Sequence, residues 1–239
     1  MSGHSKWSTI KFKKGVKDVK RAKLFTKLIR EISVAAKLGG EDPGSNPRLR
    51  TAIDKALSGN MTRDVIERAI KRAVGNDESD NLEEIRYEGY GPCGVAIIVD
   101  CLSDNRNRTV SEVRHAFSKH GGNLGTNGSV SYLFSKVGQI VLDTGSSEEK
   151  AMELAIEAGA TDIEAQDDGT INIETTPDNF LDIKEMLVKN GFSVAFSQVT
   201  MVASIEVPID GEDQEKLLRL IDRLEELDDV QEVYANCVY

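Results

Sequence analysis

The sequence has few cysteines and no long apolar run. Its three cysteines, Cys93, Cys101 and Cys237, are odd in number and lack the spacing of metal ligands, so they favour a reducing compartment over a disulfide framework. The longest apolar run, Val95 to Val99, is far shorter than the roughly 20 residues that a membrane helix needs. Lysine and serine fill the start of the chain, where a secretory signal would be apolar. These absences predict a soluble, cytoplasmic protein without a membrane partner.

Groups suited to catalysis are also scarce. The three histidines, His4, His115 and His120, stand in no recognisable motif with a serine or cysteine nucleophile. The acidic pairs Asp167-Asp168 and Asp228-Asp229 fall in predicted turns, where aspartate commonly bonds its own backbone. We therefore expect no enzyme, no catalytic residue, no metal site, no cofactor and no small-molecule substrate.

The charge is divided unevenly along the chain. The 239 residues carry 30 basic and 40 acidic side chains, a net charge of −10 that by itself disfavours a nucleic-acid ligand. Residues 1–75, however, hold 18 Lys and Arg against 7 Asp and Glu, while residues 76–239 hold 12 against 33. Such asymmetry indicates a nucleic-acid-facing end of net charge +11 joined to an acidic body of net charge −21.

The basic end is predicted to be helical. Apolar residues recur at intervals of three and four in the segments 25–36, 49–57 and 65–73, which places them on one face of a helix. Glycines follow each segment and end the three helices. Three such helices can close a small bundle, and the polar, acidic stretch 76–84 is typical of a linker.

The rest of the chain is predicted to form α/β structure. Residues 137–202 have the order β-α-β-β-α-β, which is the ferredoxin-like pattern, with a hairpin turn at Asp167-Asp168-Gly169 and a capping box of Ser146 and Glu149. Before this segment, a strand at 95–99, a helix and a strand at 129–134 form half of such a unit. After it, a strand at 205–209, a helix and a strand at 230–234 form the other half.

We therefore predict an α+β multidomain protein, in which a three-helix domain precedes two ferredoxin-like α/β domains, one inserted in the other. The expected domains are a basic helical domain at 1–79, a discontinuous ferredoxin-like domain at 80–134 plus 203–239, and an inserted ferredoxin-like domain at 135–202.

The strongest candidate site lies in the first 30 residues. Ten basic side chains face a single acid, Asp18, and such a cluster binds polyanions with release of counterions. Trp7 and Phe12 interleave with the lysines and could stack on unpaired bases. The alternative is a solvated basic face with Trp7 packed on the bundle. We predict nucleic-acid contact, to DNA or ribosomal RNA, through Lys6, Trp7, Lys11, Lys13, Lys14, Lys17, Lys20, Arg21, Lys23, Lys27 and Arg30.

Three other motifs give weaker signals. Arg106 and Arg108 stand before a helix that Thr109 and Glu112 are expected to cap, and could hold a phosphate or pair with the acidic surface. The glycine-rich stretch 121–128 runs from a helix to a strand, the reverse of the order in a phosphate-binding loop.

The second and third helices imitate a helix-turn-helix. Asp64 and Glu67, however, stand where the recognition helix would meet the bases. Carboxylates fit poorly into a groove that is rich in hydrogen-bond acceptors.

Several long motifs resemble the YebC family: GHSKWSTIK at 3–11, FTKLIREISVAAKLGG at 25–40, NPRLRTAIDKA at 46–56, NMTRDVIERAIKR at 60–72 and YEGYGPCGVAIIVDCLSDNRNRTVSEVRHAFSKHGGNLGTNGSVSYLF at 87–134. The resemblance spans nearly the whole chain. It implies a helical domain followed by two α/β domains and a non-enzymatic cytoplasmic regulator. Bacterial members are named probable DNA-binding transcriptional regulators, while relatives, including the mitochondrial translational activator of cytochrome c oxidase, support translation or act at stalled ribosomes.

Two residues depart from the family pattern. Thr62 stands where we expect proline, and Cys93 stands where we expect glycine, in a turn after Pro92. Two hypotheses remain: a DNA-binding transcriptional regulator that uses its basic N-terminal domain, and a ribosome- or RNA-binding translation factor that relieves stalled translation. We favour the first, and in both the acidic domains are available to protein partners such as the ribosome or the transcription machinery.

Overall fold

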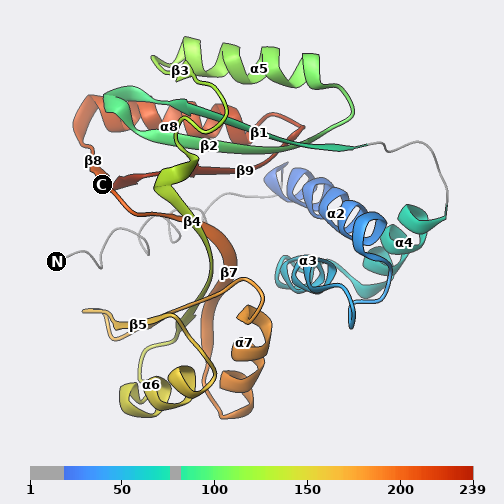
Figure 1. The fold of residues 1–239 in the computed structure, drawn as a ribbon, viewed down its shortest axis with the longest axis vertical. Coiled ribbons are helices and arrows are strands. Elements are labelled where there is room, and N and C mark those ends of the chain that lie inside the picture. The colour runs from blue at the N-terminus through green and yellow to red at the C-terminus, as the bar shows by residue number, and fades with distance from the viewer. Residues whose placement is uncertain (1–18, 76–81, 239) are drawn as a thin grey trace. The chain divides into compact units, whose positions relative to one another are not determined.

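The computed structural model describes residues 19–75 and 82–238. Residues 135–202 form one compact unit, and residues 19–75, 82–134 and 203–238 form a second. The predicted fold class is confirmed: a helical domain is followed by α/β structure (Figure 1). No helix of the described residues is long and apolar enough to cross a membrane.

Three helices form the N-terminal bundle: α2 (Val19–Gly39), α3 (Pro47–Ser58) and α4 (Arg63–Val74). The apolar faces that the spacing predicts meet in one core, and Ile32 and Leu49 within it are fully buried. Asn46 fixes the turn between α2 and α3. Its side chain accepts the N–H of Leu49 at 3.0 Å and donates to the carbonyl oxygen of Ala35 at 2.8 Å. It thereby supplies a partner that the first turn of a helix lacks.

The next domain has a four-stranded sheet in the order β3-β1-β2-β9, and α5 and α8 pack on one face of it (Figure 1). Phe117 of α5 and Leu217 and Leu220 of α8 are fully buried against the sheet. The elements of this domain run β-β-α-β-α-β along the chain, which differs from the predicted ferredoxin-like order β-α-β-β-α-β. The elements are β1 (Glu83–Tyr90), β2 (Ala96–Ser103), α5 (Arg106–Lys119), β3 (Asn123–Leu124), α8 (Gly211–Glu225) and β9 (Val230–Ala235).

Three expectations about this domain were wrong. The segment 129–134 is not a strand: η2 (Ser131–Leu133) is a 3-10 helix and only Phe134 begins β4. The strand expected at 205–209 is reduced to β8 (Val207–Pro208), which pairs with β10 (Cys237–Val238) outside the main sheet. In the main sheet, β1 stands where the strand at 205–209 was expected. It pairs antiparallel with β2 and begins inside the predicted linker. Alternating Glu and Arg side chains had concealed β1, because only every second residue faces the core.

The two capping boxes also differ from the prediction. Asn105, not Thr109, caps α5, and its side chain accepts the N–H of Arg108 at 3.1 Å. In the second case the cap is Ser147, without a side-chain bond, while the Ser146 hydroxyl donates to the carbonyl oxygen of Asp143. The capping box at Thr109 would start α5 at Val110, but the helix already starts at Arg106. The capping box at Ser146 would start α6 at Ser147, but the helix starts at Glu148.

The unit at 135–202 has the predicted order of elements, with α6 and α7 on one face of the sheet β5-β6-β4-β7 (Figure 1). Gly169 of the predicted hairpin has φ +83°, the left-handed conformation that glycine tolerates best. The elements are β4 (Phe134–Leu142), α6 (Glu148–Glu157), β5 (Asp162–Ala165), β6 (Ile171–Thr175), α7 (Phe180–Lys189) and β7 (Val194–Ala203).

Cys93 occupies a backbone position that suits glycine. It lies in η1 (Pro92–Gly94) with φ +55°, and its thiol donates to a carboxylate oxygen of Asp213 at 3.0 Å. That bond raises the pKa of the exposed Cys93 thiol. The residue is therefore held in a left-handed conformation, which costs a residue with a Cβ about 1 kcal/mol.

Replacing Cys93 with Gly should raise the free energy of unfolding by about 0.5 kcal/mol, because relief of the left-handed conformation outweighs one exposed hydrogen bond. Cys93→Ala should lower it, since alanine keeps the strain and loses the bond. Thermal unfolding of the two variants beside the parent protein measures both effects. Equal destabilisation by Gly and Ala would show that the thiol bond, not the backbone, dominates at this position.

Candidate nucleic-acid interface

The structure describes part of the predicted basic site. Lys6, Trp7, Lys11, Lys13, Lys14 and Lys17 lie outside the described residues, and so do the side chains of Lys20 and Arg21. Lys23, Lys27 and Arg30 lie on α2, on the side opposite its buried stripe as the spacing predicts. Assignment of the eleven residues to nucleic-acid contact remains a prediction.

Lys23 and Lys27 bind the C-terminal end of α8. The Lys23 ammonium donates to the carbonyl oxygen of Glu226 at 2.8 Å, and that of Lys27 donates to the carbonyl oxygen of Glu225 at 2.9 Å. The last carbonyl groups of a helix lack partners within it and form the negative end of its dipole, so cations are favourable there. Burial lowers the pKa of Lys27, while the Glu232 and Glu225 carboxylates oppose that change. These two lysines cap a helix of their own chain.

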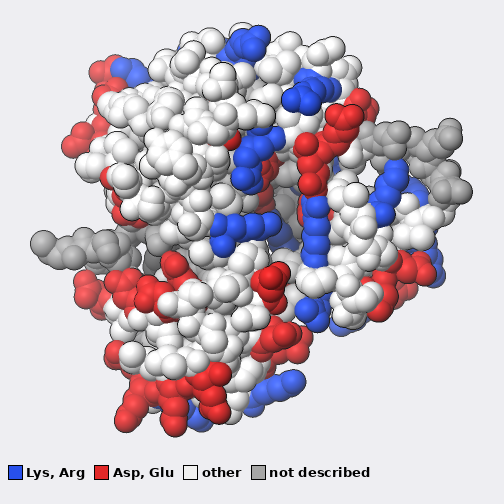
Figure 2. Space-filling model, viewed as in Figure 1, with Lys and Arg blue, Asp and Glu red and all other residues white. Residues whose placement is uncertain are grey.

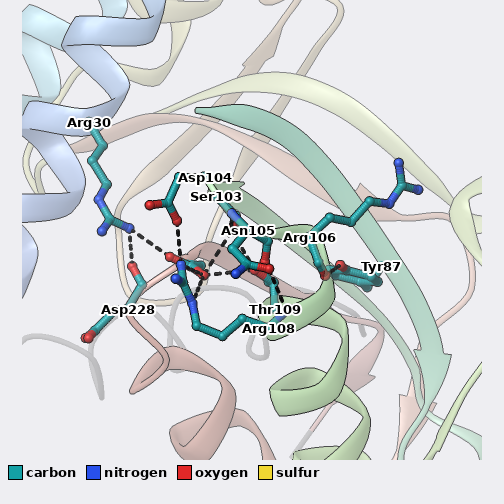
Figure 3. Close-up of polar contacts among 10 residues, drawn as sticks. Arg30, Tyr87, Ser103, Asp104, Asn105, Arg106, Arg108, Thr109 and Asp228 are labelled. Atoms are coloured by element: carbon teal, nitrogen blue, oxygen red, sulfur yellow. Dashed lines mark hydrogen bonds and ion pairs between the residues drawn. The ribbon is translucent and has the colours of Figure 1, made fainter. Parts of the chain in front are cut away.

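Arg30 extends this contact to a buried carboxylate. Its Nη1 donates to the carbonyl oxygen of Asp228 at 2.7 Å and lies 3.4 Å from the Asp229 carboxylate (Figure 3). The Asp229 side chain is only 4% exposed, whereas that of Asp228 is 81% exposed. The two neighbouring acids thus occupy very different environments, although the sequence places both in one turn.

The Asp229 carboxylate is the centre of a polar cluster, and its partners Ser103, Arg108 and Thr109 are labelled in Figure 3. It accepts hydrogen bonds from the Ser103 hydroxyl at 3.0 Å and the Thr109 hydroxyl at 2.8 Å. Arg108 donates to the same oxygen through Nη2 at 2.7 Å and through Nε at 3.3 Å. Burial of the carboxylate disfavours its charge, but the bonds from Arg108, Thr109 and Ser103 bring the pKa of Asp229 below its ordinary value. The cluster joins β2, α5 and the segment between α8 and β9.

The two secondary phosphate candidates differ in their surroundings. Both lie inside the first turn of α5 instead of before the helix. Arg108 is held by Asp229 and by Asp104, whose carboxylate is 2.7 Å from its Nη2. The exposed Arg106 guanidinium points away from the cluster, while its carbonyl oxygen accepts from the Tyr87 hydroxyl at 3.5 Å (Figure 3). Both arginines are exposed, but Arg108 is already paired with two carboxylates, whereas the Arg106 guanidinium lies outside the cluster.

Further ion pairs join the bundle to the domain that follows it. Arg48 contacts Glu31 within the bundle, at 2.8 Å, and also Glu84 of β1. Lys55 contacts Glu232 of β9. The Glu232 carboxylate raises the pKa of Lys55 against the opposing effect of burial. The bundle thus presents part of its basic surface to acids of the same chain.

The helix-turn-helix alternative finds little support in the bundle. At the start of α4, Asp64 and Glu67 are exposed together with Arg63, and Arg68 directs Nε to the carbonyl oxygen of Asp64 at 3.1 Å. The N-terminal turn of this helix would therefore bring carboxylates to base edges, which are rich in acceptors. α4 is suited to phosphate contact by Arg63 more than to base recognition.

An internal carboxylate binds N–H groups at the end of the glycine-rich stretch 121–128 and just after it. Glu88 of β1, 4% exposed, accepts the N–H groups of Gly128, Val130 and Ser131, each at 2.8 Å. Burial disfavours the charge on Glu88, but these backbone bonds bring its pKa below the ordinary value. A bound phosphate would meet the Glu88 carboxylate here, so the phosphate-loop alternative is not supported.

Two of the three histidines, His115 and His120, belong to the described residues, and His4 lies outside them. His115 is exposed on α5, and His120 follows the last residue of that helix. Burial, together with Lys119, Arg219, Arg223 and His115, lowers the pKa of His120. Within 19–75 and 82–238, no three His, Cys, Asp or Glu side chains are grouped as metal ligands.

Two structurally important carboxylates were not foreseen from the sequence. The sequence predicts only a turn at Asp229. An acid at a strand position between core residues was the available signal for Glu88. Asp229 had no such signal, because its partners Ser103 and Thr109 are 126 and 120 residues away along the chain.

Comparison with known proteins gives relatives over nearly the whole chain. Proteins named probable transcriptional regulatory protein, from Photorhabdus laumondii and Francisella tularensis subsp. novicida, are 60% and 58% identical over 236 residues. The aligned parts cover 99% of this chain and 96% and 95% of the relatives. The crystal structure of a conserved hypothetical protein, Aq1575 from Aquifex aeolicus, is similar with a TM-score of 0.79 and 50% identity. It covers 92% of this chain and 91% of its own.

Two family models divide the chain between them. Residues 5–76 match the N-terminal domain of TACO1/YebC proteins, and residues 82–237 match the second and third domains. The chain belongs to the TACO1/YebC family, as the sequence motifs indicated.

Proposed function

We propose that this protein is a non-enzymatic, nucleic-acid-binding regulator of gene expression, and that it binds DNA as a transcriptional regulator. The charge distribution carries the proposal. Residues 1–75 have a net charge of +11 in a chain of net charge −10, so a polyanion is attracted to one end and repelled by most of the rest. The relatives named probable transcriptional regulatory proteins support DNA as the target.

The contact surface in this proposal is the basic N-terminal segment. The described contacts divide its residues into two groups. Lys23, Lys27 and Arg30 already bind the end of α8 and Asp229, so a phosphate would have to compete with these bonds. The remaining residues of the segment therefore make the first contact with nucleic acid in this proposal: Lys6, Trp7, Lys11, Lys13, Lys14, Lys17, Lys20 and Arg21. Exposed Arg106 is a secondary candidate.

A ribosome- or RNA-binding translation factor is the second candidate function. It is favoured by exposed Asp64 and Glu67 at the start of α4, which weaken sequence recognition in a DNA groove. The unit at 135–202 carries 13 acidic and 4 basic side chains, and Figure 2 shows acidic side chains gathered on its visible face. Such a surface suits basic proteins of the ribosome or of the transcription machinery as partners.

Binding at physiological salt separates the two functions. The full-length protein is titrated against mixed-sequence 30-bp DNA duplexes, and its co-sedimentation with ribosomes is measured in parallel. Sub-micromolar duplex binding without ribosome association supports the transcriptional regulator. Ribosome association without duplex binding supports the translation factor and contradicts the first proposal. If neither occurs, both are wrong.

A further inference from the structure

An acid-free segment interrupts the acidic body of the protein. Between Glu112 and Asp143 there are 30 residues, 113–142, without a single Asp or Glu, although residues 76–239 contain 33. The segment also contains Arg114, Lys119 and Lys136, together with both histidines of the body. In Figure 2 the visible surface over α5 carries basic and uncharged atoms. The segment itself therefore contributes no carboxylate that would repel a polyanion.

Tyr132 has an exposed aromatic ring, and the backbone on both sides of it is held by hydrogen bonds. Its side chain is 72% exposed, while Val130 and Phe134 on either side of it are 0% and 8% exposed. The Leu133 N–H donates to the carbonyl oxygen of Val130 at 2.9 Å. The carbonyl oxygen of Leu133 accepts from both the N–H and the hydroxyl of Ser204, at 2.8 and 3.1 Å. The backbone is thus fixed on both sides of a ring that faces water.

Tyr90 places a second ring beside the same loop. It is 37% exposed, and its hydroxyl donates to the carbonyl oxygen of Ser129 at 3.1 Å. Partial burial, and then the nearby Tyr132 hydroxyl, raise the pKa of Tyr90. Two tyrosines therefore lie close together in a protein in which only 5% of residues are aromatic. Tyrosine loses little conformational entropy on binding because it has only two side-chain torsions.

The loop between the two rings is already ordered. The Glu88 carboxylate accepts the N–H of Gly128 in the loop and those of Val130 and Ser131 just after it, and the Glu88 carbonyl oxygen accepts the N–H of Gly125 at 2.8 Å. The Glu88 carboxylate is buried and its oxygens already accept these hydrogen bonds, so it presents little charge to a ligand. Asn123, Thr126 and Asn127 of the loop are exposed, and their side chains can both donate and accept hydrogen bonds.

We propose that Tyr132 and Tyr90, with the exposed side chains of the loop 121–129, bind unpaired nucleobases of a single-stranded nucleic acid. The rings supply π-faces on which any base can stack, and the amide and hydroxyl groups supply partners for base edges. A duplex hides its base faces and does not use such a surface. The inference rests on the proposed nucleic-acid binding and adds a second, non-basic site to it. Arg114 and Lys119, exposed on the helix that leads into the loop, favour the backbone of the strand.

The test compares single strands with a duplex. Affinities of the full-length protein for 12-nucleotide oligo(U), oligo(dT) and a 12-bp duplex are measured by fluorescence anisotropy over a range of salt concentrations. Tyr132→Ala should weaken binding of both single strands roughly tenfold and leave duplex binding unchanged. The slope of log affinity against log salt should stay the same, since stacking releases no counterions. Tyr132→Phe keeps the ring and should stay within about twofold of the parent.

Leu38→Ala is a matched control, because Leu38 is 70% exposed on α2 and should leave every affinity unchanged. Unchanged single-strand affinity of Tyr132→Ala would overturn the site. Parent protein that binds the duplex but neither single strand would also overturn it, while leaving the proposed function standing. Absence of binding to all three probes at low salt would contradict both.

Discussion

Replacing Asp229 with Asn should lower the free energy of unfolding by about 3 kcal/mol, one of the largest effects we expect from a single substitution. The carboxylate is almost fully buried and accepts from Ser103, Thr109 and Arg108. Asparagine has the same shape, but it directs a neutral amide at the Arg108 guanidinium and removes one of its two countercharges, leaving that of Asp104. Breaking a buried ion pair from one side typically costs about 3–5 kcal/mol, and we expect the lower end of that range because the Arg108 side chain is 43% exposed. Urea denaturation at pH 7 measures the loss.

Asp228→Asn is the matched control for this variant. Asp228 is the neighbouring residue with the same chemistry, but its side chain is 81% exposed, so its replacement should change stability by less than about 0.5 kcal/mol. Equal losses from the two variants would show that the effect comes from the turn or from net charge. A negligible loss from Asp229→Asn would mean that the cluster contributes little.

The cost of Asp229→Asn should depend on pH. The folded pKa of Asp229 is lowered, so its charge stabilises the fold fully above the unfolded value of about 3.9. That stabilisation is lost as the pH falls through the folded pKa. The difference between parent and variant should therefore be constant from neutral pH down to about pH 5 and shrink at lower pH. A difference that grows on acidification would contradict this sign.

Helical periodicity predicted the bundle well because its core is built from local patterns. Phe25, Leu28 and Ile32 recur every three or four residues and meet two other helices with the same pattern. The same reasoning failed at 129–134, where Val130, Tyr132 and Phe134 alternate like a strand. Two buried residues that flank an exposed one fit a 3-10 turn equally well. Short segments leave such ambiguity, because a period cannot be measured over six residues.

The polar contacts could not be predicted because they connect residues far apart in sequence. Lys23 and Lys27 are expected on one face of α2, and they lie there. Their bonds to Glu225 and Glu226, however, depend on the position of α8, which starts at Gly211. Whether a basic helix face meets water, a phosphate or a helix C-terminus is a tertiary property, since spacing fixes only the face.

Removing four lysines from the N-terminal segment should have the largest effect on function. We expect Lys11, Lys13, Lys14 and Lys17, all replaced with Gln, to weaken duplex binding by about a hundredfold or more at 0.15 M salt. The slope of log affinity against log salt should become shallower by about 3.6, because each lost phosphate contact removes about 0.9. Fluorescence anisotropy with a 30-bp duplex at four salt concentrations gives both quantities.

The matched control replaces four lysines of the unit at 135–202, Lys136, Lys150, Lys184 and Lys189, with Gln. The change in net charge is the same, so a purely global electrostatic effect would weaken binding equally and contradict the assigned site.

A third variant with Gln at Lys23, Lys27 and Arg30 tests the division of the basic surface. These three side chains bind the end of α8. Their loss should therefore lower stability while changing the salt slope by less than about 1. A larger slope change from these three than from the four N-terminal lysines would place the phosphate contacts on α2 and require release of α8 on binding.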